Sequence, residues 1–156
     1  MWQRGKDAEN KETVSLRKSL EAVLDGLKFS LVELTVSRHR GSVQVRVVIY
    51  NGSSISTDDC SKVHRAIMPR LELAFEGQDI YLEVSSPGID RLIKDRSEFA
   101  HYRGRAVRCY RTDISNWTAG ILESADEKGI VIKTKEGAVR LEFEIIAKAK
   151  LDGSAA

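Results

Sequence analysis

The sequence predicts an α+β protein built in two parts, an α-β-β-α-β two-layer domain and a small antiparallel β-barrel. In the first half, two stretches place apolar residues at helical spacing and three place them at every second position. In the second half, short alternating stretches follow one another between turn residues. We expect the N-terminal domain to span 13–88 and the barrel to span 89–152, with flexible tails at 1–12 and 153–156.

The first helix and the hairpin after it are predicted from apolar spacing. One helical face collects Leu16, Leu20, Val23, Leu24 and Leu27. Two alternating strands follow, with Val32, Leu34 and Val36 in the first and Val43, Val45, Val47 and Ile49 in the second. Arg-His-Arg-Gly at 38–41 turns one strand back into the other.

The second helix carries its own start signal. Ser56 with Asp59 three residues later resembles a capping box, with Asp in place of the usual Glu. Pro69 should kink this helix or end it near Met68. The apolar face of the helix holds Cys60, Val63, Ile67, Leu71 and Ala74. A third strand then alternates through Ile80, Leu82 and Val84, and we expect it beside the first strand in a sheet covered by both helices.

The second half changes to strands after a short helical turn at 97–102. RAVRCYR, NWTAGILES, GIVIKTK and AVRLEFE read as strands, and IIAKAKL is a candidate fifth. About sixty residues with five short strands fit an SH3-like or Sm-like barrel. Tyr110 and Trp117 fall in these strands, and the barrel core is the favoured position for Trp117.

The stretch LEVSSPGIDR at 82–91 ends the third strand in Ser-Pro-Gly. Proline presets the first central residue of a type II turn, and glycine accepts the positive φ of the second, so we expect this turn at 86–89. A nucleophile elbow would have glycines around the serine, which this stretch lacks. We therefore expect no catalytic residue here but an interdomain joint formed by Ser86, Pro87, Gly88 and Asp90.

Composition excludes several classes of protein. With 42% hydrophobic and 31% charged residues, the chain is too apolar for a disordered protein and too charged for a membrane protein. No stretch approaches the roughly 20 apolar residues of a spanning helix, and MWQRGKDAENKE lacks the apolar core of a secretion signal. We expect a cytoplasmic protein whose Cys60 and Cys109 stay reduced and buried.

The net charge of +2 conceals local clustering. Residues 1–90 carry 12 Lys and Arg against 13 Asp and Glu, whereas residues 91–156 carry 13 against 10. Arginine forks suit phosphate and carboxylate oxygens, although for a charge run taken alone a solvated surface is the favoured explanation. Few aromatic residues accompany the cations, so single-strand stacking is not indicated. The candidate RNA- or partner-binding residues are Arg38, Arg40, Lys62, Arg65, Arg91, Lys94, Arg96, Arg105 and Arg108.

Two smaller constellations carry weaker signals. Cys60 and His64 stand four residues apart on one helical face, a spacing that can hold a metal. A structural zinc site needs about four ligands, and the remaining His and Cys residues are scattered, so we expect no metal and no cofactor. Asp90 and Arg91 either form a local ion pair or face a partner.

Three motifs resemble those of the ribosome maturation factor RimP family. LEVSSPGIDR at 82–91 is similar to the family signature, and STDDC at 56–60 is similar to its helix-start motif. FAHYRGRAV at 99–107 resembles the segment that leads into its barrel. The resemblance runs in order over roughly 13–151. Leu92 stands where the family usually has proline, which leaves the exit from the joint less constrained.

The resemblance implies a KH-like N-terminal domain and an SH3-like barrel. It also implies a cytoplasmic, non-enzymatic factor that binds the immature 30S subunit at ribosomal protein S-twelve and adjacent 16S rRNA and promotes its assembly. We expect a monomer without a membrane partner. A peptide-binding adaptor that uses the barrel is the alternative, and an enzyme that uses Ser86 or Cys60 is a third hypothesis.

Overall fold

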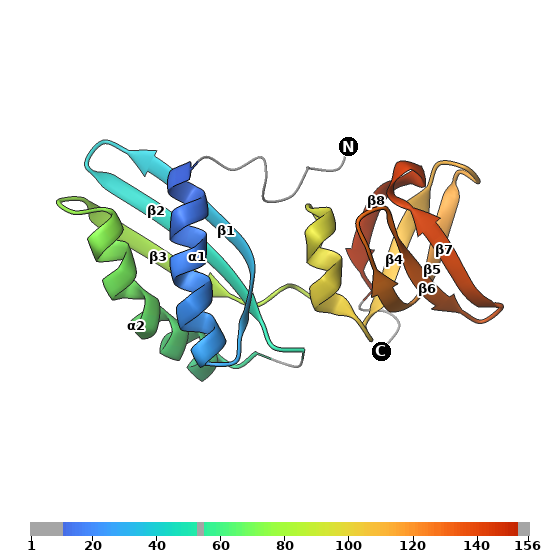
Figure 1. Cartoon of the computed structure of the whole chain (residues 1–156), viewed down its shortest axis with the longest axis horizontal. Helices are drawn as coiled ribbons and strands as arrows, with labels where there is room; N and C mark the ends of the chain where they lie inside the picture. The colour runs from blue at the N-terminus through green and yellow to red at the C-terminus, as the bar shows by residue number, and fades with distance from the viewer. Residues whose placement is uncertain (1–10, 53–54, 153–156) are drawn as a thin grey trace. The chain divides into compact units, whose positions relative to one another are not determined.

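The structure, a computed structural model, describes residues 11–52 and 55–152, apart from the side chain of Lys11. The chain divides between Pro87 and Gly88 into two compact units, and each unit has its own β-sheet (Figure 1). The tails expected at 153–156 and over most of 1–12 lie outside the described residues. Within the described ranges, no helix has the length and apolar run needed to cross a membrane.

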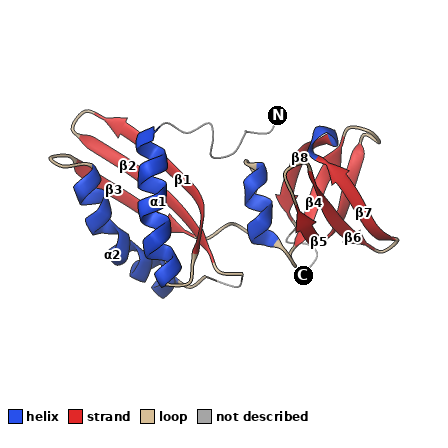
Figure 2. Ribbon diagram, viewed as in Figure 1, coloured by secondary structure: helices blue, strands red, loops and turns tan. Residues whose placement is uncertain are grey.

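The N-terminal unit has the predicted α-β-β-α-β order. Its elements are α1 (Lys11–Gly26), β1 (Ser30–His39), β2 (Ser42–Tyr50), α2 (Thr57–Ala74) and β3 (Asp79–Ser85). Both helices cover the same face of the sheet (Figure 2). Their apolar stripes pack on the central strand in one core that includes Leu20, Leu24, Val45, Val47, Ile67 and Leu71. Complete burial of a side chain of this size contributes about 1.5–3 kcal/mol, so this core holds the two layers together.

The strand order of this sheet corrects the sequence prediction. We expected the third strand beside the first, but the order is β1-β2-β3, with β2 in the centre. β1 pairs with β2 antiparallel, whereas β2 pairs with β3 in parallel. Because α2 connects β2 to β3, the three elements form a β-α-β crossover, the usual connection between neighbouring parallel strands. Apolar alternation is the same for either order, so the pattern could not choose between them.

A bulge in β1 changes which of its residues face the helices. The β1–β2 register shifts between Leu31 and Glu33. Leu31 and Leu34 both belong to the core under the helices, whereas Val32 is buried outside that core. The expectation that Val32 and Leu34 share one face is therefore wrong, because one extra residue reverses the side-chain phase of a strand.

Helix α2 begins as predicted and continues past its proline. The Ser56 hydroxyl accepts from the Asp59 N–H at 3.0 Å, and the Asp59 carboxylate accepts from the Ser56 N–H at 2.9 Å, which completes the capping box. The helix does not end near Met68 but runs through Pro69 to Ala74. Pro69 is exposed, so water can satisfy the carbonyl that it leaves unpaired. Ala74, expected in the core, is exposed, and the next residue, Phe75, is buried instead.

The C-terminal unit is an antiparallel sheet of five strands. Its elements are the 3-10 helix η2 (Arg96–Tyr102), β4 (Ala106–Arg111), β5 (Asn116–Ala125), β6 (Gly129–Thr134), β7 (Gly137–Glu142), η3 (Phe143–Ile145) and β8 (Ile146–Leu151). The strand order is β7-β6-β5-β4-β8, so the candidate fifth strand is present as β8. The inward side chains are fully buried, among them Val107, Cys109, Leu122, Ile130, Ile132 and Leu141. This strand count and layout are those expected for the predicted SH3-like or Sm-like unit.

The turn after β3 is not the predicted type II turn. Such a turn at 86–89 requires a positive φ at Gly88, and Gly88 does not have one. The chain turns two residues later, where the Arg91 N–H donates to the Gly88 carbonyl at 3.1 Å. A Cβ added at Gly88 would meet nothing within 4 Å. The backbone therefore does not demand glycine at this position.

Candidate functional site

Arg91, one of the predicted binding arginines, has a largely buried side chain. Its Nε donates to Glu98 Oε1 at 2.9 Å, and its Nη2 donates to Glu98 Oε2 at 3.2 Å. The two side chains are only 9% and 3% exposed. Of the two roles left open for Arg91, this geometry favours a structural ion pair, formed with Glu98, over a cation presented to a partner.

Glu98 receives further donors in the same pocket. The Tyr102 hydroxyl donates to Oε1 at 3.3 Å, and the Lys94 N–H donates to Oε2 at 3.3 Å. Burial and the negative charge of Glu98 raise the pKa of Tyr102, so the phenol stays protonated and remains a donor. These hydrogen bonds connect Arg91 and Lys94, which precede η2, to Glu98 of η2. The network therefore stabilises the local structure.

The predicted cations of the N-terminal unit lie in two separate places. Arg38 forms an ion pair with Glu12 and lies over the Phe75 ring, 5.3 Å from its centroid, and Arg40 is exposed at the hairpin turn. Lys62 and Arg65 are exposed three residues apart on α2, so they share a face. Ten residues of helix, about 15 Å, separate Arg65 from the end where Phe75 lies. These four cations do not form one patch.

The remaining predicted cations lie around η2 and on β4. Lys94 and Arg96 are exposed, and the Arg96 guanidinium lies over the Phe143 ring at 5.8 Å. Arg105 is half-buried just before β4. Arg108 is half-buried on β4, and its Nε is shielded from solvent without a hydrogen-bond partner. The joint residues Ser86, Pro87 and Gly88 have no regular secondary structure, and Asp90 is exposed in the turn.

Trp117 is not in the barrel core, which corrects the sequence prediction. It is 37% exposed on β5, opposite Tyr110 of β4. The Arg108 guanidinium lies 4.8 Å from the indole centroid and Lys150 Nζ lies 5.8 Å from it, while the Tyr110 ring meets it edge-on at 5.5 Å. In β4, the buried residues Val107 and Cys109 alternate with Arg108 and Tyr110. This alternation is the sequence signal that places Arg108 and Tyr110 on the outward face of the strand.

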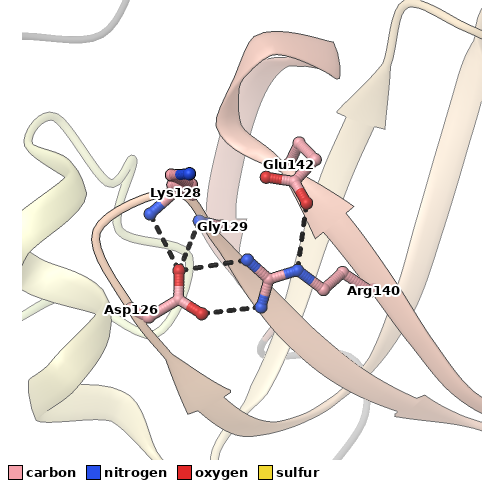
Figure 3. Close-up of polar contacts among 5 residues, drawn as sticks. All are labelled: Asp126, Lys128, Gly129, Arg140 and Glu142. Carbon is pink, nitrogen blue, oxygen red and sulfur yellow. Dashed lines mark hydrogen bonds and ion pairs between the residues drawn. The ribbon is translucent and has the colours of Figure 1, made fainter.

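Two other arginines of the C-terminal unit, Arg140 and Arg111, form ion pairs with carboxylates. Arg140 of β7 donates to both oxygens of Asp126 and to Glu142 (Figure 3). Asp126 Oδ1 also accepts from the N–H groups of Lys128 and Gly129, so it fastens the turn between β5 and β6. The hydrogen bonds from Arg140 and from these backbone groups hold the pKa of Asp126 well below its usual range. Arg111 pairs with Asp113 at 2.6 Å.

The candidate nucleophile and ligand residues show no assembled reaction centre within the described chain. Cys109 is fully buried, and burial raises its pKa to about 12, so its thiol stays protonated. Cys60, expected to be buried, is half-buried, and both cysteines are free thiols. Cys60 and His64 line a shallow hollow of about 510 Å³ between α2 and β3. No group of three or more His, Cys, Asp or Glu is close enough to hold a metal in the described ranges.

The fold and these surfaces define an α+β protein with a helix-covered mixed sheet in one unit and an antiparallel five-stranded sheet in the other. Residues 19–90 match the family model described as the RimP N-terminal domain. The chain is therefore similar to the ribosome maturation factor RimP family, which confirms the resemblance indicated by its sequence motifs.

Relatives match this chain over nearly its whole length. Ribosome maturation factor RimP of Borrelia turicatae (strain 91E135) is 28% identical over 143 residues, which are 92% of this chain and 96% of that protein. Ribosome maturation factor RimP of Borrelia recurrentis (strain A1) is 27% identical, and that of Borrelia hermsii (strain HS1 / DAH) is 29% identical. Each of these two matches covers 94% of this chain and 98% of the relative. The similarity therefore includes both compact units.

Proposed function

We propose that this protein acts in ribosome maturation by binding the immature 30S subunit. Its docking site there consists of ribosomal protein S-twelve and the adjacent 16S rRNA. It works in the cytoplasm as a monomer, without a cofactor and without covalent chemistry. The observation that carries the proposal is the match over nearly the whole chain to proteins named ribosome maturation factor.

The cations of the described surface support a partner with exposed phosphates. Arg40, Lys62, Arg65, Lys94 and Arg96 are all exposed, and they belong to both compact units. Such side chains contact phosphate oxygens without reading sequence, and their contribution falls as salt rises. A factor that binds one conformer of an unfinished subunit more tightly raises the population of that conformer, so assembly is promoted without a chemical step.

The alternative, a peptide-binding adaptor, requires an exposed aromatic surface on the barrel and binding that is insensitive to salt. Trp117 supplies exposed aromatic surface. Arg108 and Lys150 lie against its ring, however, so binding there should weaken as salt rises. This observation favours an anionic partner over an apolar or proline-rich peptide.

The test is co-sedimentation of the full chain with immature 30S subunits at several salt concentrations. The double variant Arg40→Glu/Arg65→Glu replaces two exposed cations, and Lys135→Glu, on the β6–β7 turn outside the candidate set, is the matched control. We expect the double variant to bind several-fold more weakly. We also expect a salt dependence shallower by about one unit of slope for each phosphate that the variant no longer neutralises.

Two results would count against this assignment. If the parent chain never travels with 30S precursors and cells that lack it make normal 30S subunits, the function is wrong. If the parent binds but the double variant and the control bind equally well, the subunit contacts do not involve Arg40 and Arg65.

A further inference from the structure

The outward face of β4, β5 and β8 gathers residues from three strands. Strand register places Ala106, Arg108 and Tyr110 opposite Ile121, Ala119 and Trp117 of β5. On the other side of β4, Arg108 lies opposite Lys150 and Tyr110 lies opposite Lys148. Paired residues of an antiparallel sheet share a face, so these side chains form one surface. We call it the Trp117 face, defined by Ala106, Arg108, Tyr110, Trp117, Ala119, Ile121, Lys148 and Lys150.

Trp117 is the aromatic centre of this face. Its indole is held by Tyr110, which meets it edge-on, and by Arg108, whose guanidinium lies 4.8 Å from the ring centroid. With 37% of the residue still exposed, the indole keeps surface available to a ligand. Neighbours on two strands orient the ring, so little conformational entropy remains to be lost when a flat ligand binds.

The charge of the Trp117 face has one sign. Three of its defining residues, Arg108, Lys148 and Lys150, are cations, and none is acidic. Arg108 forms no ion pair within the described chain, unlike Arg91, Arg111 and Arg140 of the same unit. The shielded Arg108 Nε still has a donor without a partner. That Nε is shielded from solvent, but the positive charge of the guanidinium has no carboxylate partner among the described residues, and an unpaired cation beside an exposed aromatic ring favours a ligand that carries anionic oxygens.

We propose that the Trp117 face binds an unpaired nucleotide of RNA, with a base stacked on the Trp117 indole and the flanking phosphates held by Arg108, Lys148 and Lys150. This inference rests on the proposed function, which supplies ribosomal RNA as the partner, and it assigns RNA contact to the C-terminal unit. A base and an indole stack through flat π-surfaces, and the neighbouring cations neutralise the backbone. A base inside a duplex is already stacked on its neighbours, so the face selects single-stranded segments.

The charge of the Trp117 face favours RNA over a peptide as its ligand. A proline-rich peptide would use the indole but would leave three cations without partners. An acidic peptide would satisfy the cations but gain less from a flat aromatic surface. Only a strand that alternates flat rings with anionic groups uses both features of the face, and single-stranded RNA has this structure.

The test uses the fluorescence of Trp117 itself. The chain has two tryptophans, Trp2 and Trp117, so Trp2→Phe leaves Trp117 as the only indole. The full-length Trp2→Phe protein is titrated with three probes: a single-stranded RNA of about eight nucleotides, an abasic strand of the same length, and an RNA duplex. We expect the single strand to quench the indole emission strongly, and the abasic strand and the duplex to quench it little.

Variants locate the binding site on the face. In the parent background, Trp117→Ala should weaken single-strand binding by roughly tenfold, because the base can no longer stack on an indole. Trp117→Phe keeps an aromatic surface and should retain much of the affinity. Ile114→Ala removes an exposed apolar side chain from the neighbouring β4–β5 turn and should bind like the parent. Circular dichroism confirms that each variant is folded before its affinity is compared.

The outcomes separate this inference from the proposed function. Quenching by the abasic strand equal to that by the intact strand would overturn base stacking, as would unchanged RNA affinity in Trp117→Ala. Loss of 30S co-sedimentation in Trp117→Ala without any quenching by RNA would mean that the face docks on ribosomal protein, which also overturns it. If the parent is quenched by single-stranded RNA but never co-sediments with 30S precursors, the proposed function fails and the Trp117 face stands as an RNA site.

Discussion

Arg91 and Arg108 lie 17 positions apart in the same compact unit, in two differently built regions. In the segment around η2, Arg91 is 9% exposed and donates twice to Glu98. On the Trp117 face, Arg108 lies against an indole, and its Nε has no hydrogen-bond partner. One guanidinium forms an ion pair inside the protein, and the other forms no ion pair within the described chain. A cluster of arginines in a sequence is therefore a set of candidates, and the residue opposite each one decides its role.

The strongest contrast should appear when Arg91 is removed. We expect Arg91→Ala to lower the free energy of unfolding by about 3–5 kcal/mol, because Glu98 would remain buried and charged without its partner. The double variant Arg91→Met/Glu98→Leu removes both charges and should recover most of that loss. Urea unfolding measures both effects. Equal midpoints for Arg91→Ala and the parent would show that the pair is not structural.

The next effect concerns the strand that carries Trp117. Gly120 lies between Ala119 and Ile121, and a Cβ there would meet the Ile132 side chain and the Lys133 carbonyl. We expect Gly120→Ala to force β5 away from β6 and to cost about 1–3 kcal/mol in unfolding free energy. Gly88→Ala is the matched control, since an added Cβ meets nothing there and no positive φ is involved. If both variants unfold at the same denaturant concentration, close packing at Gly120 is not required.

A smaller change in stability is expected at Arg108. Arg108→Met keeps the length of the side chain and removes one cation–π interaction, worth about 0.5–1 kcal/mol at a partly exposed site. The free energy of unfolding should therefore stay within about 1 kcal/mol of the parent value, while the affinity for single-stranded RNA falls. Urea unfolding and fluorescence titration on the same preparation measure the two quantities. A large loss of stability would place Arg108 in the same structural class as Arg91.

The smallest expected effect is a pH dependence of the melting temperature, caused by the ion pair between Asp126 and the exposed Arg140. Because the folded-state pKa of Asp126 is depressed, its contribution is present above the unfolded pKa of roughly 4 and is lost as pH falls through the folded value. Asp126→Asn should lower the melting temperature slightly at neutral pH, and the difference should shrink as the pH falls below about 4. Melting curves at pH 7 and pH 3 measure this. A constant difference across that range would exclude the carboxylate charge as the cause.

Much of the fold was predictable because short-range patterns specify it. The apolar stripes of α1 and α2, the capping box of Ser56 and Asp59 and the five barrel strands follow from residue spacing alone. The wrong positions have local causes. The bulge after Leu31 adds one residue to β1. Of the two effects expected of Pro69, the end of the helix does not occur, because buried Ile67 and Leu71 anchor the helix on both sides. The turn forms at Ile89 and Asp90 rather than at Pro87 and Gly88.

The candidate site was less predictable, since it depends on which strands become neighbours. The sequence offers nine candidate cations, and within each compact unit they lie in more than one place. Lys148 and Lys150 were not among them, although the register with β4 places both beside Arg108 and Tyr110. The core was the favoured position for Trp117, but it lies outside. The residues around it in β5 do not show which face of the strand packs against the core.

Residue order alone established the succession of helices and strands, the start of α2, and the resemblance to a known family, because these depend on neighbours a few positions apart. Three features depended on the folded chain: β3 pairs with β2, Glu98 forms an ion pair with Arg91, and Trp117 lies outside the core beside Arg108 and Lys150. Each of these requires knowing which segments pack side by side, and that choice is made by the free energy of the whole core rather than by the pattern of any one segment.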